Sequence, residues 1–145
     1  MPDNPFVFWF IAGPGWALFL YLCVAQCLSA ISYRLGIRMG AQEPAERITE
    51  VGVAFWWAVA FSDIVFYTPL LGLGLWGHWT GAGWAPIVLA AALGITVYWP
   101  IMSLAAVYRA RSAPGWTLPK ERQYWVVLPI IAAWGALALV LLLRA

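Results

Sequence analysis

The residue that most needs a chemical explanation is a single carboxylate, Asp63, inside a long apolar stretch of the chain. No other Asp, Glu, Lys, Arg or His lies in the central part of such a stretch. A charged side chain in the middle of a membrane helix costs on the order of 3 kcal/mol. Asp63 could therefore bind a proton or a cation, or orient a polar ligand. It could equally stabilise a helix bundle through hydrogen bonds to tyrosine hydroxyls, or contact another subunit.

The partners expected for Asp63 are polar side chains at the same depth. Ser62 is its neighbour, and Tyr67 lies about one helical turn further along. Thr96 and Tyr98 lie at the centre of the next apolar stretch, which returns across the same thickness if the two run antiparallel. The candidate ligand- or proton-binding residues are therefore Asp63, Tyr67, Tyr98, Thr96 and Ser62.

Tryptophans in the apolar stretches are the candidate lining of a cavity that holds a lipid-like ligand. A lipid-binding protein should have a lateral opening lined by aromatic side chains. The residues expected in this role are Trp56, Trp57, Trp99 and Trp134.

Metal and cofactor chemistry has weaker support in the sequence. Cys23 and Cys27 stand four residues apart, and two thiolates at that spacing could hold a soft metal such as Cu(I). No His or Met stands beside them, so packing at a helix seam is the expected role. The sole histidine, His78, cannot supply both axial ligands of a b-type haem. We predict no metal site and no cofactor.

Catalytic chemistry is not indicated either. The sequence shows no nucleophile–base pair, phosphate-binding loop or metal-ligand cluster, so no catalytic residue is assigned. The net charge of +2 is small and scattered, which argues against a nucleic-acid partner.

The composition indicates where such residues must be held. Of the 145 residues only 10% are charged, whereas 64% are hydrophobic and 17% aromatic. A soluble domain of this size has too much surface for its volume to hide that many apolar side chains. Eleven tryptophans point the same way, because indole rings favour the bilayer interface. The chain is expected to be an integral membrane protein.

Four apolar stretches reach the ~20 residues that a helix needs to cross ~30 Å of hydrocarbon. Each is separated from the next by a segment rich in glycine, proline or charge. We therefore predict one all-α domain over residues 1–145, an antiparallel up-down-up-down bundle of four membrane helices. The expected spans are residues 6–32, 51–76, 84–108 and 124–143.

Basic residues predict the orientation of the bundle. Lys and Arg are retained on the cytoplasmic side of membrane proteins. Apart from Arg144, they fall in the connections after the first and third stretches, which should face inward while both termini face outward. The expected location is the inner membrane of a bacterial cell, as a multi-pass protein. The residues concerned are Arg34, Arg38, Arg47, Arg109, Arg111, Lys120 and Arg122.

Three functions are compatible with these features. The favoured one is an accessory or structural subunit, or a binding protein for a lipid-like hydrophobic ligand. The main alternative is a proton- or cation-coupled small-solute transporter or channel that works as an oligomer, with Asp63 at the coupling site. The weakest is a membrane enzyme that acts on lipid. The expected partners are membrane lipids and either other membrane subunits or further copies of the chain.

Overall fold

The computed structural model describes residues 4–144, and every regular element in that part of the chain is a helix. Four helical rods in it are long and apolar enough to cross a membrane, and they agree with the predicted stretches to within four residues at either end. The prediction of an all-helical protein with four candidate membrane spans is confirmed by length and hydropathy. Spans one to four are Pro5–Ile31, Thr49–Thr80, Ala85–Ala110 and Glu121–Arg144.

Spans one and two are each interrupted by a π-helical turn, whereas spans three and four are single α-helices. Span one consists of α1 (Pro5–Tyr21), the π-helix η1 (Leu22–Gln26) and α2 (Cys27–Ile31). Span two consists of α4 (Thr49–Ser62), the π-helix η3 (Asp63–Tyr67) and α5 (Thr68–Thr80). Spans three and four are α6 (Ala85–Ala110) and α7 (Glu121–Arg144). A short helix α3 (Tyr33–Arg38) and a 3₁₀ turn η2 (Ala45–Arg47) connect the first two spans.

The π-helix η3 ends two residues before a proline, Pro69. Pro69 has no backbone N–H, and in a regular α-helix its ring would clash with the carbonyl of Val65, four residues earlier. The turn before it is wider, and the N–H of Thr68 donates to the carbonyl of Asp63, five residues back. The π-helix therefore absorbs the proline without breaking the span. It also places Asp63 at the start of the widened turn.

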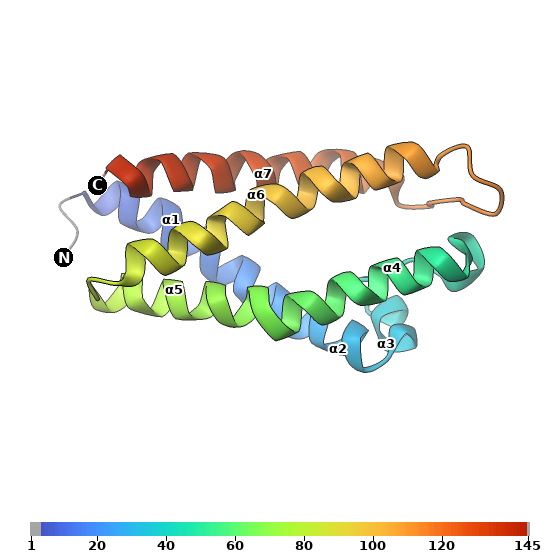
Figure 1. Ribbon diagram of the computed structural model, residues 1–145, viewed down its shortest axis with the longest axis horizontal. Coiled ribbons are helices and arrows are strands. Elements are labelled where there is room, and N and C mark those ends of the chain that lie inside the picture. Colours follow the sequence, from blue (N-terminus) through green and yellow to red (C-terminus); the bar gives the residue numbers. More distant parts are fainter. Residues whose placement is uncertain (1–3, 145) are drawn as a thin grey trace.

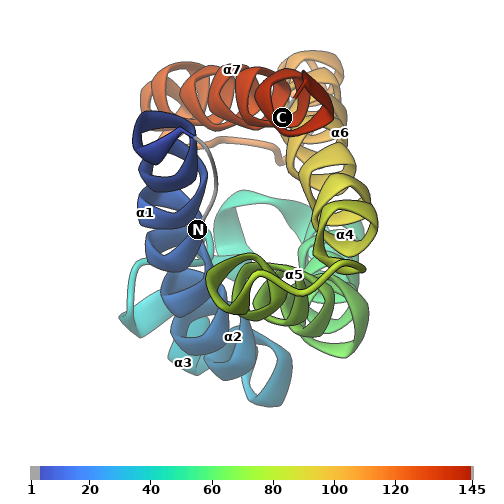
Figure 2. The same cartoon turned by 90° about the vertical axis from the view of Figure 1, so that its left-hand side faces the viewer.

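The spans surround a common axis. Viewed along that axis, α7, α6, α5 and α1 follow one another around a ring (Figure 2). α1 packs against α5 and α7, and α6 packs against the same two helices. The start of α1, the end of α7 and the turn between α5 and α6 lie at one end of the molecule (Figure 1), which we call the turn end. The connections formed by residues 32–48 and 111–120 lie at the other end, the loop end (Figure 1).

The half of the bundle toward the turn end is tightly packed. Its close helix contacts depend on small residues: a Cβ added to Gly74 would lie 3.0 Å from the Cα of Leu89, so α5 and α6 can approach this closely only with glycine there. One cluster of buried side chains from all four spans fills this half. Its members are Ile11, Leu22, Tyr67, Leu71, Leu75, Leu89, Ala92, Leu93, Ala138 and Leu142.

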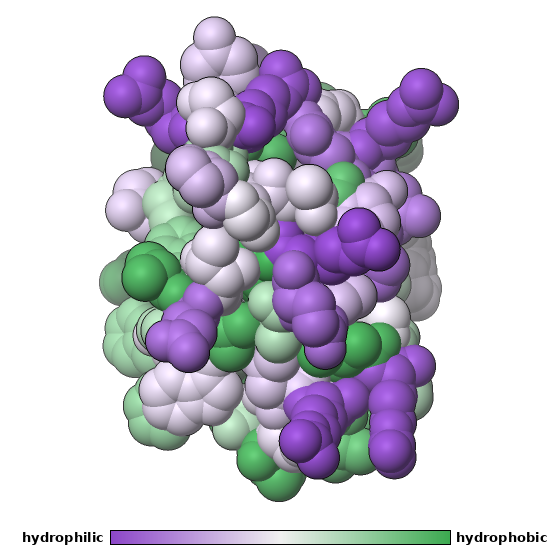
Figure 3. Space-filling view, turned by 90° about the vertical axis from the view of Figure 1, so that its right-hand side faces the viewer, coloured by the Kyte–Doolittle hydropathy of each residue, from purple (hydrophilic) through white to green (hydrophobic). Residues whose placement is uncertain are grey.

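The half toward the loop end is less completely filled. α4 packs mainly against α2, and it lies apart from α6 in the view of Figure 1. The buried hydrophobic cluster here is small, with Ile48, Trp56 and Val107 at its centre. Hydrophilic side chains gather over the surface of the loop end (Figure 3). This surface belongs to the two connections that carry most of the basic residues.

Candidate functional site

Asp63 lies inside the protein, at the point where spans one and two are interrupted. Its side chain is 6% exposed, and its Oδ2 accepts a hydrogen bond of 2.9 Å from the Nε2 of Gln26. Gln26 is the last residue of η1, and Asp63 is the first residue of η3. The two π-helices pack against each other, so the hydrogen bond joins the two irregular turns. π-Helical turns occur frequently at functional sites.

The partner of Asp63 is an amide rather than a tyrosine hydroxyl. The expectation of tyrosine partners is therefore wrong, although Asp63 is buried between helices as expected. An amide is a neutral donor, so it satisfies an oxygen without neutralising a charge. Within residues 4–144, the one ion pair joins Arg111 to Glu121 at the loop end. Asp63 thus has no cationic partner in the described part of the chain.

Tyr67 and Thr96 do meet, in a second polar contact of their own. Their hydroxyl oxygens are 2.6 Å apart, and both residues are fully buried. Thr96 also donates its only hydroxyl proton to the carbonyl of Ala92, at 2.9 Å. Tyr67 is therefore the donor to Thr96, and a chain of two hydrogen bonds links span two to the backbone of span three.

Ser62 and Tyr98 do not join either contact. Both lie on the outside of the bundle, and Tyr98 is 66% exposed. The reason is the helical period of about 100° per residue. Tyr98 follows Thr96 by two residues, so it points to nearly the opposite side of α6. Equal depth in the membrane was the basis for choosing these residues, and depth does not determine the direction of a side chain.

A cavity of about 260 Å³ lies on the bundle axis in the half toward the loop end. Its wall includes residues of all four spans and of both connections at the loop end. Gln26 is among them, so the cavity reaches the residue that holds Asp63. The wall residues are Tyr21, Gln26, Gly40, Ala41, Gln42, Trp56, Val59, Trp99, Lys120, Gln123, Tyr124, Val127, Leu128 and Ile131.

Two of the four candidate tryptophans line this cavity, namely Trp56 and Trp99. Their indole nitrogens are buried and have no hydrogen-bond partner. The other two are used elsewhere. Trp57 is exposed on α4 and donates to the carbonyl of Ala30 at 3.1 Å, and Trp134 donates to the carbonyl of Phe10 at 2.9 Å, which ties span four to span one.

The cavity opens toward the side of the bundle between spans one and four. Tyr21 on span one is 53% exposed and Val127 on span four is 49% exposed, yet both belong to the wall. Side chains that line a cavity and also face the surroundings mark its opening. In a bilayer, this opening would face lipid rather than water.

Contacts between the two connections border the loop end of the cavity, where the wall residues Gly40 and Gln123 are themselves exposed. The backbone N–H of Thr117 donates to the carbonyl of Arg47 at 2.6 Å, and the ammonium of Lys120 donates to the carbonyl of Gly40 at 2.9 Å. The hydroxyl of Tyr124 donates to Oε1 of Glu43 at 3.2 Å. Residues more than 65 positions apart in the sequence therefore form one floor.

Glu43 in this floor is a buried carboxylate that the sequence analysis did not single out. It is 1% exposed, and its Oε2 has no hydrogen-bond partner. The hydroxyl of Tyr33 donates to its backbone carbonyl at 3.1 Å. Burial, together with the negative charge of Glu43, raises the pKa of Tyr33 to about 12, so Tyr33 remains a neutral donor at physiological pH. The sequence does not distinguish Glu43 from the exposed Glu46. The contact that marks Glu43 comes from Tyr124 on α7, 81 positions later in the chain.

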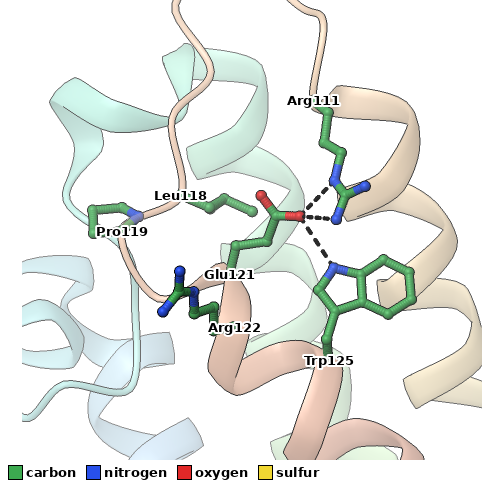
Figure 4. A pocket seen from close by; sticks show the side chains of 6 residues that line it. All are labelled: Arg111, Leu118, Pro119, Glu121, Arg122 and Trp125. Atoms are coloured by element: carbon green, nitrogen blue, oxygen red, sulfur yellow. Dashed lines mark hydrogen bonds and ion pairs between the residues drawn. The ribbon is translucent and has the colours of Figure 1, made fainter.

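A second and shallower pocket lies on the surface of the loop end. Arg111, Leu118, Pro119, Glu121, Arg122 and Trp125 line it (Figure 4). Glu121 accepts hydrogen bonds from Arg111 and, at 3.1 Å, from the indole of Trp125. Arg111 is half exposed, and an ion pair between exposed side chains contributes at most ~1 kcal/mol. None of its lining residues forms a hydrogen bond with Asp63 or Glu43.

The two cysteines are half-buried free thiols on span one. Among residues 4–144, no three His, Cys, Asp or Glu side chains come together in a way that could hold a metal ion. No protein-family model, curated protein or solved structure matches the chain, so the arrangement of its side chains carries the functional argument.

The Tyr67 contact gives a prediction with a matched control. Tyr67→Phe removes the donor to Thr96 at a buried site, so the free energy of unfolding should fall by about 1 kcal/mol. Tyr98→Phe makes the same chemical change on the outer surface, and its effect should be below ~0.5 kcal/mol. Denaturation in detergent micelles, followed by circular dichroism, measures both. Equal effects of the two variants would contradict the burial of this contact.

Proposed function

We propose that this chain is a membrane protein that binds a lipid-like amphipathic ligand in its central cavity. The observation that carries the proposal is an aromatic-lined cavity on the bundle axis with an opening between spans one and four. An apolar pocket with a few polar groups is the usual form of a small-molecule site, and helix bundles build such sites in their cores. The apolar part of the wall comes largely from Trp56, Trp99 and α7.

The size of the cavity limits what it can hold. Pockets that enclose a drug-sized ligand have volumes of roughly 300–1,000 Å³. At about 260 Å³, this cavity accommodates a polar group and the first carbons attached to it, but not a whole lipid. The side opening allows the remaining chains to stay in the bilayer. Gln26, Gln42 and Gln123 supply amide groups to the polar end of the ligand.

The proposal includes an orientation in the membrane. The four spans cross alternately, as an antiparallel bundle, with the loop end at the cytoplasmic face because its connections carry most of the Lys and Arg. In a variant without Cys23 and Cys27, a cysteine at Ser112 should react with an impermeant thiol reagent only from the cytoplasmic side. A cysteine at Gly83, in the turn after α5, should react only from the opposite side. The reverse pattern would invert the assignment.

Filling the cavity tests the binding function. Val59 lies in the cavity wall on α4, so Val59→Trp should occupy the ligand's space and reduce lipid retention at least severalfold. Val65→Trp, at an exposed position of the same span, is the matched control and should retain lipid as the unchanged protein does. Native mass spectrometry after mild-detergent purification counts both bound lipid and protein subunits. Equal retention by the two variants would contradict the proposal. A stoichiometric second protein with no lipid would favour an accessory subunit instead.

One observation favours proton- or cation-coupled transport as a second candidate. The cavity ends at Gln26, which bonds the buried Asp63, and beyond this point the bundle is packed. A site reachable from one end and closed toward the other is a common feature of alternating access.

Asp63→Asn tests this candidate, because it keeps the shape of the side chain but removes its ability to exchange a proton. In proteoliposomes with an internal pH-sensitive dye, the variant should lose any protein-dependent proton flux. Glu50→Gln, an exposed acid on the same span, should keep that flux. Unchanged flux in Asp63→Asn would remove Asp63 from the coupling role.

A further inference from the structure

Glu43 is a buried acid directly behind the wall of the cavity. Its neighbour Gln42 lines the cavity, and so does Tyr124, whose hydroxyl donates to Oε1 of Glu43. The other carboxyl oxygen is buried without a partner. At 3.2 Å, the hydrogen bond from Tyr124 is long for an O–H donor, which leaves the carboxylate weakly held.

No cation compensates Glu43 in the described part of the chain. The groups packed around it are the hydroxyls of Tyr33 and Tyr124, both neutral donors, and the ammonium of Lys120 bonds the carbonyl of Gly40 instead. The one ion pair in residues 4–144 is that of Arg111 with Glu121. Buried charges in proteins are normally paired, because an isolated charge in a low-dielectric interior is strongly unfavourable.

The position of Glu43 indicates which cation could pair with its carboxylate. It lies in the floor at the loop end, which is the depth of lipid headgroups if the four spans cross a bilayer. Lys120 lines the same end of the cavity and carries the opposite charge. An acid and a base at one end of a small cavity match a headgroup that contains both an ammonium and a phosphate.

We propose that the loop end of the cavity binds the headgroup of an ammonium-bearing phospholipid. Glu43 accepts the ammonium in place of the Tyr124 hydroxyl, and Lys120 contacts the phosphate. The acyl chains leave through the opening beside Tyr21 and Val127. This inference rests on the proposed lipid-binding function and adds the chemical class of the ligand.

The experiment compares phospholipids with and without an ammonium in the headgroup. The purified full chain is exchanged into nanodiscs that contain equal amounts of phosphatidylethanolamine and phosphatidylglycerol, and the lipids that stay bound are counted by native mass spectrometry. A charge-assisted hydrogen bond should give phosphatidylethanolamine a preference of about tenfold. N-acetyl phosphatidylethanolamine, which keeps the phosphate but has no ammonium, should lose this preference on the unchanged protein.

Two glutamates in the same connection give matched variants. Glu43→Gln should remove the preference while total lipid retention persists, and Glu46→Gln, at an exposed position, should leave the preference intact. Equal retention of the two lipids by the unchanged protein would overturn the inference, and so would a preference that survives Glu43→Gln. The comparison with N-acetyl phosphatidylethanolamine decides the question even if Glu43→Gln does not fold. Absence of any retained lipid would overturn the proposed function itself, so the two failures are distinguishable.

Discussion

Hydrocarbon offers no hydrogen-bond partner, and this constraint governs the middle of the bundle. A carboxyl group at that depth must be satisfied by the protein, and Gln26 does so for Asp63. The contact requires spans one and two to approach each other where both are π-helical. In span two, the wider turn also solves the problem of a proline that cannot continue a regular hydrogen-bond ladder. One polar pair and two π-helical turns therefore mark the middle of the bundle.

The middle of the bundle separates two halves with different roles. Toward the turn end, aliphatic side chains from all four spans pack closely, and Gly74 allows α5 and α6 to touch. Toward the loop end, α4 lies apart from α6 (Figure 1), and residues of all four spans line a cavity. Packing in a membrane depends on close contact rather than on exclusion of water, so an incompletely filled half can persist when other contacts hold it.

Those other contacts are polar and come from the two connections at the loop end. Hydrogen bonds from Thr117 to Arg47 and from Lys120 to Gly40 join the two connections at the floor of the cavity. Glu43 is part of the same floor and is left with an unpaired oxygen. The loop end is thus both the polar face of the molecule (Figure 3) and the boundary of its cavity. A ligand with a charged head and apolar chains fits this combination, because the floor is polar while the opening beside Tyr21 faces the bilayer side.

The number, length and approximate limits of the spans were readable from the sequence, because a 20-residue apolar run has few physical alternatives to a membrane helix. Burial of Asp63 was predictable for the same reason, since a carboxylate cannot face lipid at that depth. The hydrogen-bond partner of Asp63 was not predictable from the sequence. Tyr98 shares the depth of Thr96 but faces outward, and Gln26 reaches Asp63 across a helix interface. Glu43 looks like an ordinary surface glutamate until α7 covers it. Hydropathy along one chain reports how deep a residue lies, whereas the direction of its side chain depends on helix rotation and packing, which only the tertiary structure decides.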